Sequence, residues 1–135
     1  MATPEQLLHG FMTEMNAWEL RCAERTEQCV RGELTFDRAT EIGVSEYMDI
    51  FRRYCSQSKG VPRDFYYTEP PDYDPDRELI LNATEMSPVL FSLRTQQNYS
   101  HRKSHLFSFT REDGQWRLFA RHILMVDGSV LESNL

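Results

Sequence analysis

Histidines are the residues of this sequence best suited to proton chemistry near neutral pH. His122 lies in an alternating stretch, residues 115–126, where it shares a predicted strand face with Trp116 and Leu118. A histidine held there could act as a general base with a tuned pKa. No acidic residue stands at a supporting position along that strand, so a core histidine with one hydrogen bond is the favoured interpretation.

A second pair, His101 and His105, has the spacing of zinc ligands on a helix. This stretch is expected to enter a strand, where four residues separate two side chains by about 13 Å. Arg102 and Lys103 also place positive charge between the histidines. We therefore predict no metal site, and the absence of a glycine-rich phosphate loop or a nucleophile elbow predicts no cofactor.

The connection between residues 61 and 78 concentrates the acidity of the chain. It holds six acids against two bases, and its prolines exclude regular structure. Tyrosines are favoured anchors at protein interfaces, and acids steer a basic partner. We expect a partner-binding surface here; the alternative is a solvated loop whose tyrosines pack on a sheet. The candidate partner-binding residues are Tyr66, Tyr67, Glu69, Asp72, Tyr73, Asp74, Asp76 and Glu78.

The composition limits the partners that the protein can take. Its 135 residues carry 21 acids and 15 bases, a formal net charge of −6, whereas a nucleic-acid binder needs a basic surface. No stretch approaches the roughly 18 apolar residues of a membrane-spanning helix, and no basic start precedes an apolar signal segment. We expect a cytoplasmic protein with a single domain over residues 1–135 that binds neither nucleic acid nor membrane directly.

The cysteines of the chain also favour the cytoplasm. There are three, Cys22, Cys29 and Cys55. If Cys22 and Cys29 share a helix, they lie about 10 Å apart along its axis. A disulfide needs Cα atoms within about 7 Å, so this pair cannot close. Buried free thiols in a reducing compartment are predicted.

Two helices are predicted in the first part of the chain. The first follows a capping box at residues 3–6 and ends near Gly32. The second extends from Thr35 to about Ser56, with Gly43 as a candidate interruption. Glu19 is expected off the apolar face of the first helix. The two apolar faces comprise Leu7, Phe11, Met15, Trp18 and Cys22, and Ala39, Ile42, Tyr47, Ile50, Phe51 and Tyr54.

The chain after Leu79 is predicted to form strands over residues 79–83, 89–97, 105–111 and 115–126. Asp113-Gly114 is a strong hairpin signal between the last two. Helices followed by antiparallel strands indicate an α+β fold, with the helices packed on one face of a curved sheet.

Four segments carry a likeness to a known family: Arg52–Cys55, Phe65–Glu78 with its Pro-Pro-Asp-Tyr-Asp run, the hairpin Phe107–Leu118, and Asp127–Glu132. With the order of elements, they resemble bacterial immunity proteins of the nuclear transport factor 2-like fold, which belong to polymorphic toxin systems. The resemblance implies N-terminal helices across a strongly bent antiparallel sheet. It also implies neutralisation of a cognate toxin made by the same cell. The family does not share one toxin type, so the activity of the toxin is not implied.

The resulting hypothesis is an immunity protein, not an enzyme, that binds its toxin and occludes the active site. The acidic loop would meet a basic surface, as expected for a toxin that acts on nucleic acid or NAD. Two alternatives stay open. One is a dehydratase- or isomerase-like enzyme with His122 as base in the cone pocket. The other is a homodimeric ligand-binding module that pairs through an outer sheet face at Phe119, Ile123 and Met125.

Overall fold

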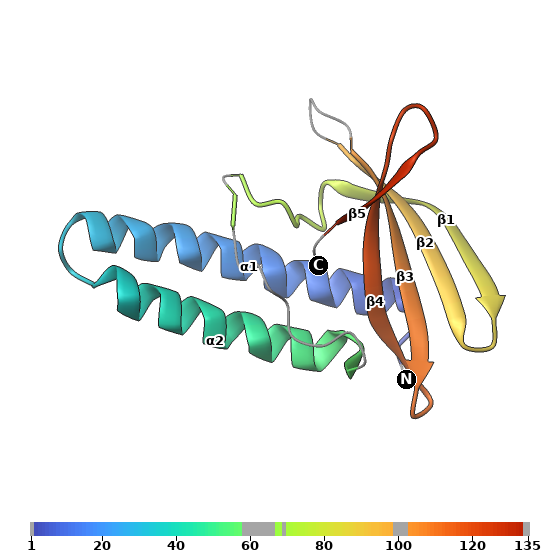
Figure 1. Ribbon diagram of the computed structural model, residues 1–135, viewed down its shortest axis with the longest axis horizontal. Helices are drawn as coiled ribbons and strands as arrows, with labels where there is room; N and C mark the ends of the chain where they lie inside the picture. Colours follow the sequence, from blue (N-terminus) through green and yellow to red (C-terminus); the bar gives the residue numbers. More distant parts are fainter. Residues whose placement is uncertain (1, 58–66, 69, 99–102, 134–135) are drawn as a thin grey trace.

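The computed structural model describes residues 2–57, 67–68, 70–98 and 103–133. Its helices and strands are α1 (Pro4–Val30), α2 (Phe36–Tyr54), β1 (Glu78–Ser87), β2 (Leu90–Gln97), β3 (Ser104–Glu112), β4 (Gln115–Leu124) and β5 (Val130–Ser133). The strands form one antiparallel sheet in the order β1-β2-β3-β4-β5. Figure 1 shows a helical hairpin that meets the curved sheet at one end and extends beyond it at the other. The predicted α+β architecture is confirmed.

Helix α1 begins at the predicted capping box. Thr3 accepts a hydrogen bond from the backbone N–H of Gln6 at 3.2 Å, and the Gln6 side chain accepts from the Thr3 N–H at 3.0 Å. The predicted apolar face is buried except for Leu7, which is half-buried. Glu19 is buried with it, at 2% exposure, so its expected place off that face is wrong. Glu19 lies four residues after Met15 and three before Cys22 and therefore shares their side of the helix.

Helix α2 begins at its predicted cap, Thr35, which accepts from the N–H of Arg38 at 3.2 Å. It continues through Gly43 without a break, and the carbonyl of Gly43 accepts a hydrogen bond from the Trp18 indole at 2.9 Å. Neither helix of the described chain is long and apolar enough to cross a membrane.

Arg117 of β4 joins the end of α2 to the sheet. Its guanidinium donates to the backbone carbonyls of Arg53 and Cys55 at 2.9 and 3.1 Å. A cation is favourable at this position because the carbonyls at a helix C-terminus carry partial negative charge. The chain then passes beside β4, where the N–H of Ser56 donates to the carbonyl of Leu118 at 2.8 Å.

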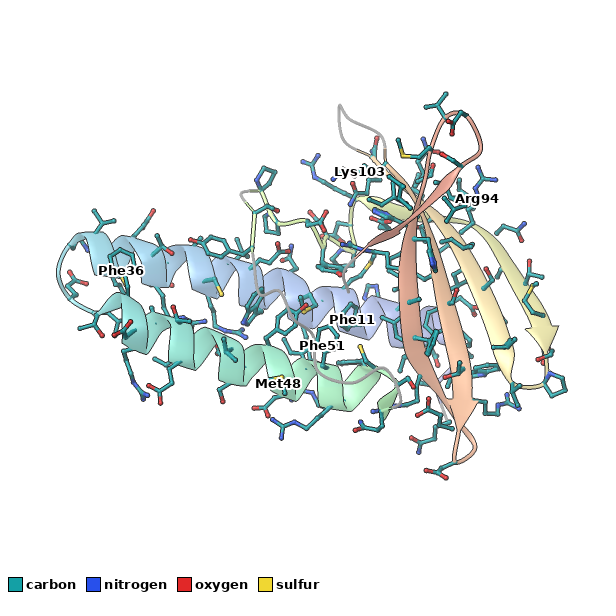
Figure 2. The ribbon with its side chains drawn as sticks, in the orientation of Figure 1. Phe11, Phe36, Met48, Phe51, Arg94 and Lys103 are labelled. Atoms are coloured by element: carbon teal, nitrogen blue, oxygen red, sulfur yellow. The ribbon has the colours of Figure 1, made fainter. Side chains whose placement is uncertain are left out.

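The core lies where the two helices meet the concave face of the sheet. Figure 2 shows Phe11 and Phe51 near this end of the helices and Phe36 at the far end. The Phe11 ring contacts the Phe51 and Tyr73 rings edge-on, with centroids 6.0 and 5.3 Å apart. The three cysteines are free and buried, as predicted. The sheet contributes Leu93, Phe107, Phe109, Trp116 and Leu118 to this core.

The strands differ from the prediction mainly at the two edges of the sheet. β1 continues to Ser87 instead of ending near residue 83, and β5 was not predicted. The hairpin at Asp113-Gly114 is confirmed, with φ of 51° and 75° at its two central residues. Positive φ at both positions is the geometry that matches the twist of a two-residue hairpin.

Candidate functional site

The loop predicted to bind a partner is held against α1 by one buried carboxylate. Glu19 accepts from the backbone N–H groups of Thr68 and Asp72 through Oε1, each at 3.1 Å. Its Oε2 accepts from the N–H of Tyr73 at 3.0 Å. The side chain of Asn16 donates to the carbonyl of Tyr73 at 2.9 Å. Burial raises the pKa of Glu19, and the three backbone donors offset only part of that effect.

A buried ion pair joins the same loop to β4. Nη1 of Arg121 lies 3.0 Å from Oδ2 of Asp72, with 4% and 17% of the side chains exposed. The guanidinium also lies over the ring of Tyr73, 4.6 Å from its centroid. Burial raises the pKa of Asp72, but Arg121, Lys103 and Gln97 outweigh it, so the pKa lies below its usual value. Asp72 is therefore a carboxylate at neutral pH whose charge is compensated inside the fold.

Glu78, where the loop enters β1, is also internal. Its Oε1 lies 3.0 Å from Nδ1 of His105 and accepts from the Thr95 hydroxyl at 2.6 Å. The side chains of Glu78 and His105 are 3% and 2% exposed. In the part of the chain that the structure describes, no three metal-ligating side chains cluster. His101 lies outside that part.

The tyrosines of the loop differ in their surroundings. Tyr73 is 5% exposed and belongs to the core. Tyr67 is half-buried, and its hydroxyl forms a hydrogen bond with Thr26 of α1. Tyr66 lies outside the described residues. The alternative in which the tyrosines pack on the sheet therefore applies to Tyr73, which contacts Arg121 of β4, whereas the hydroxyl of Tyr67 bonds to α1.

Two further acids of the loop, Asp74 and Asp76, are more accessible. Asp76 is exposed. The Asp74 side chain is 23% exposed, and its Oδ2 lies 3.8 Å from Nε of Arg77. Glu69 lies outside the described residues. Because Asp72 and Glu78 are paired internally, the loop presents less negative charge to solvent than its composition indicates.

A bulge in β4 decides which residues of that strand face the helices. The pairing with β3 shifts by one residue after Leu118 and leaves Phe119 as an extra residue. Beyond the bulge, Arg121 lies opposite the fully buried Phe107 and shares its face. His122 points to the other face because successive side chains alternate. The prediction that His122 shares a face with Leu118 is therefore wrong.

The interior of the cone is filled by side chains. Phe107, Phe109 and Leu118 are 0% exposed, and Trp116 is 7% exposed. These four side chains occupy the part of the cone where the enzyme alternative places its pocket. A cavity of about 150 Å³ lies elsewhere, between α1 and α2, where Trp18 and other mainly apolar side chains line it.

Glu19 and Arg121 organise this region, and neither was among the predicted site residues. The spacing of Glu19 from Met15 and Cys22 was a usable signal, because it places the carboxylate on the buried face of α1. Arg121 had no such signal. Strict alternation assigns it to the solvent face, and only the bulge at Phe119 turns it toward Asp72.

Strand β1 contrasts with the loop because little of it is covered. Residues 79–86 are all exposed, and Leu79, Leu81 and Met86 have exposed fractions of 58%, 50% and 65%. β1 is also an edge strand, paired on one side with β2. Figure 1 shows it on the side of the sheet farthest from the helical hairpin.

Comparison with known proteins agrees with this architecture. The family model described as NTF2 fold immunity protein matches residues 3–131, which include both helices, the loop and strands β1 to β4. The chain belongs to the NTF2 fold immunity protein family. It is also similar to the immunity protein RhsIA of Dickeya dadantii (strain 3937), with 22% identity over 118 residues, which cover 87% of this chain and 84% of the relative. No solved structure matches the chain. The family match and the similarity to RhsIA both support an immunity role for this chain.

Proposed function

We propose that this NTF2 fold immunity protein binds a cognate toxin and neutralises it by occluding its active site, with no chemical step of its own. The family match over residues 3–131 carries the proposal, and the similarity to RhsIA supports it. The filled cone is consistent with binding through a surface, since enzymes and ligand carriers of small molecules use concave pockets.

The expected toxin has a basic substrate site. The immunity protein has a formal net charge of −6, and opposite charge on a partner accelerates association and excludes wrong partners. A toxin that acts on nucleic acid or on NAD must bind phosphates, so its active site carries positive charge. Such a toxin acts in the cytoplasm, which is where we propose that the immunity protein meets it.

The loop before β1 is the proposed contact surface, with a division of roles among its residues. Asp72, Tyr73 and Glu78 hold the loop in shape through internal contacts. A loop held in its bound shape loses less entropy when the partner binds. The proposed toxin-facing residues are Tyr66, Tyr67, Glu69, Asp74 and Asp76.

Purification of the tagged protein from its native host, with mass spectrometry of the bound proteins, identifies the partner. We expect one stoichiometric partner that stops growth when it is produced alone and is harmless when it is produced together with this protein. A bound partner whose toxicity does not change on co-production, or that is not toxic, would contradict the proposed function.

A further inference from the structure

The exposed edge of β1 is unusual for a monomeric protein. Unpaired N–H and C=O groups on an edge strand are a template for another strand, and natural proteins protect such edges with charged residues, especially Lys, with Pro, with β-bulges or with very short strands. β1 is ten residues long and contains no Lys, Arg or Pro. In the described chain, its outer edge pairs with no other strand.

The central part of β1 has regular geometry. Asn82–Glu85 keeps a regular register with Phe91–Arg94 of β2. Irregularities in register follow on both sides and leave Leu81 and Met86 without a partner residue in β2. Asn82–Glu85 is thus a short, regular template for an added strand, and an exposed apolar side chain, Leu81 or Met86, borders it at each end.

The apolar exposure extends past the strand into the hairpin. Val89 and Leu90 are 53% and 47% exposed, which adds to the exposed leucines and Met86 of β1. Monomers seldom expose contiguous apolar patches of more than a few hundred Å², and larger ones mark interaction sites. Burial of these side chains against a partner would therefore stabilise a complex.

We infer that β1 is a second part of the toxin interface and that it accepts an extended apolar segment of the toxin, flanked by basic residues, as an added strand. This inference rests on the proposed function. In this mode of recognition, backbone hydrogen bonds give affinity and side chains of alternating direction give specificity. Leu81 and Met86 contact the apolar residues of the added strand.

Two exposed acids near β1, Asp76 and Glu85, favour basic residues in that segment. Glu85 is exposed and has no ion pair among the described residues. Asp76, two residues before the strand, is exposed as well. Two exposed arginines also lie at this edge: Arg77, whose Nε is 3.8 Å from Oδ2 of Asp74, and Arg94 of β2, which pairs with Asn82. Because Asp74 balances Arg77, Asp76 and Glu85 remain against Arg94. A segment with Lys or Arg beside its apolar residues complements both acids.

The same charges argue against a second copy of this chain as the occupant. Two copies would each bring a net charge of −6 and the same exposed acids to the shared edge. The like charges of two copies repel each other, whereas the charges of a basic partner attract these acids.

The test replaces the two apolar residues that border the template, in the variant Leu81→Lys/Met86→Lys. Both side chains are at least half exposed, so the fold is expected to persist with an unchanged Tm. The probe is the toxin identified by co-purification, and affinity is measured by calorimetry. We expect binding to weaken at least a hundredfold. The matched control is Val30→Lys/Val126→Lys, which makes the same changes at exposed apolar residues outside β1 and should bind as the wild type does.

Hydrogen–deuterium exchange of the wild-type complex gives an independent readout. We expect residues 79–86 to gain protection when the toxin binds. Unchanged exchange there, with wild-type affinity in the β1 variant, would overturn this inference and leave the proposed function intact. Light scattering tests the other occupant. If the free wild-type protein is a dimer and the Leu81→Lys/Met86→Lys variant is a monomer, the edge binds a second copy of this chain and the inference is wrong. If the wild-type protein does not neutralise the toxin, the proposed function itself fails.

Discussion

The loop that ends at Glu78 and the strand that begins there have opposite relations to the core. Tyr73 is 5% exposed and the Glu78 side chain 3%, whereas Leu79 and Leu81 are 58% and 50% exposed. α1 explains the difference, because it supplies Glu19 and Phe11 to the loop but leaves most of β1 uncovered. In this part of the molecule, burial follows the position of a helix and not the polarity of the side chains.

The largest expected effect in this comparison comes from Glu19. Glu19→Ala would leave three N–H groups of the loop, one buried and two partly buried, without their acceptor. Because each such group costs about 1–3 kcal/mol, we expect the free energy of unfolding in urea to fall by more than about 3 kcal/mol. Glu24→Ala, at an exposed position of the same helix, is the control and should change it by less than about 0.5 kcal/mol. Equal effects of the two substitutions would show that the Glu19 bonds do not hold the loop.

Truncation of leucines on adjacent strands sharpens the contrast within the sheet. Leu93 of β2 is 0% exposed, and Leu81 of β1 is 50% exposed. We expect Leu93→Ala to reduce the free energy of unfolding by about 3 kcal/mol and Leu81→Ala to reduce it by less than about 1 kcal/mol. Similar losses in the free protein would mean that β1 is covered in solution.

A smaller effect, with a defined pH dependence, is expected from Asp72→Asn. We expect a loss of about 2 kcal/mol at pH 7, less than the 3–5 kcal/mol of a fully buried pair because the Asp72 side chain is 17% exposed. The pKa of Asp72 is lowered in the folded state, so the unfolded chain binds the proton first as pH falls. The stabilisation is thus complete above about pH 4 and is lost below it.

Urea unfolding of the wild type and of Asp72→Asn between pH 7 and pH 3 measures this dependence. The difference between the two proteins should shrink below about pH 4. Asp76→Asn is the matched control, since Asp76 is exposed, and it should show no such trend. A constant difference for Asp72→Asn over the whole range would contradict the assignment of its stabilisation to the ionised pair.

The smallest expected effect concerns the accessible charge of the loop. Asp76→Lys should slow association with the toxin severalfold at low salt and less at high salt, with little change in dissociation, as is typical of rim charges. Stopped-flow kinetics at two salt concentrations measures this. Glu24→Lys makes the same charge change on α1 and controls for net charge. Identical association rates for the two variants would remove Asp76 from the interface.

Local signals in the sequence predicted the helices and the fold class well. The capping box at Thr3, the cap at Thr35 and the Asp113-Gly114 hairpin depend on neighbouring residues alone, and all three are confirmed. β5 is four residues long and has no alternation long enough to detect.

The candidate site was harder to predict because its contacts connect distant segments. Asp72 pairs with Arg121 only because a bulge at Phe119 reverses the alternation of β4, and a bulge leaves no pattern in a single sequence. The exposure of β1 had no local signal either. Its apolar run is typical of a core strand, and only the placement of α1 leaves it uncovered.

The most direct test of the account is a titration of toxin activity with the purified immunity protein. Neutralisation by binding predicts that activity falls linearly and reaches zero at one equivalent of protein, with the mass of the toxin unchanged. Inhibition by far less than one equivalent, or a change in the mass of the toxin, would indicate catalytic turnover and contradict the account.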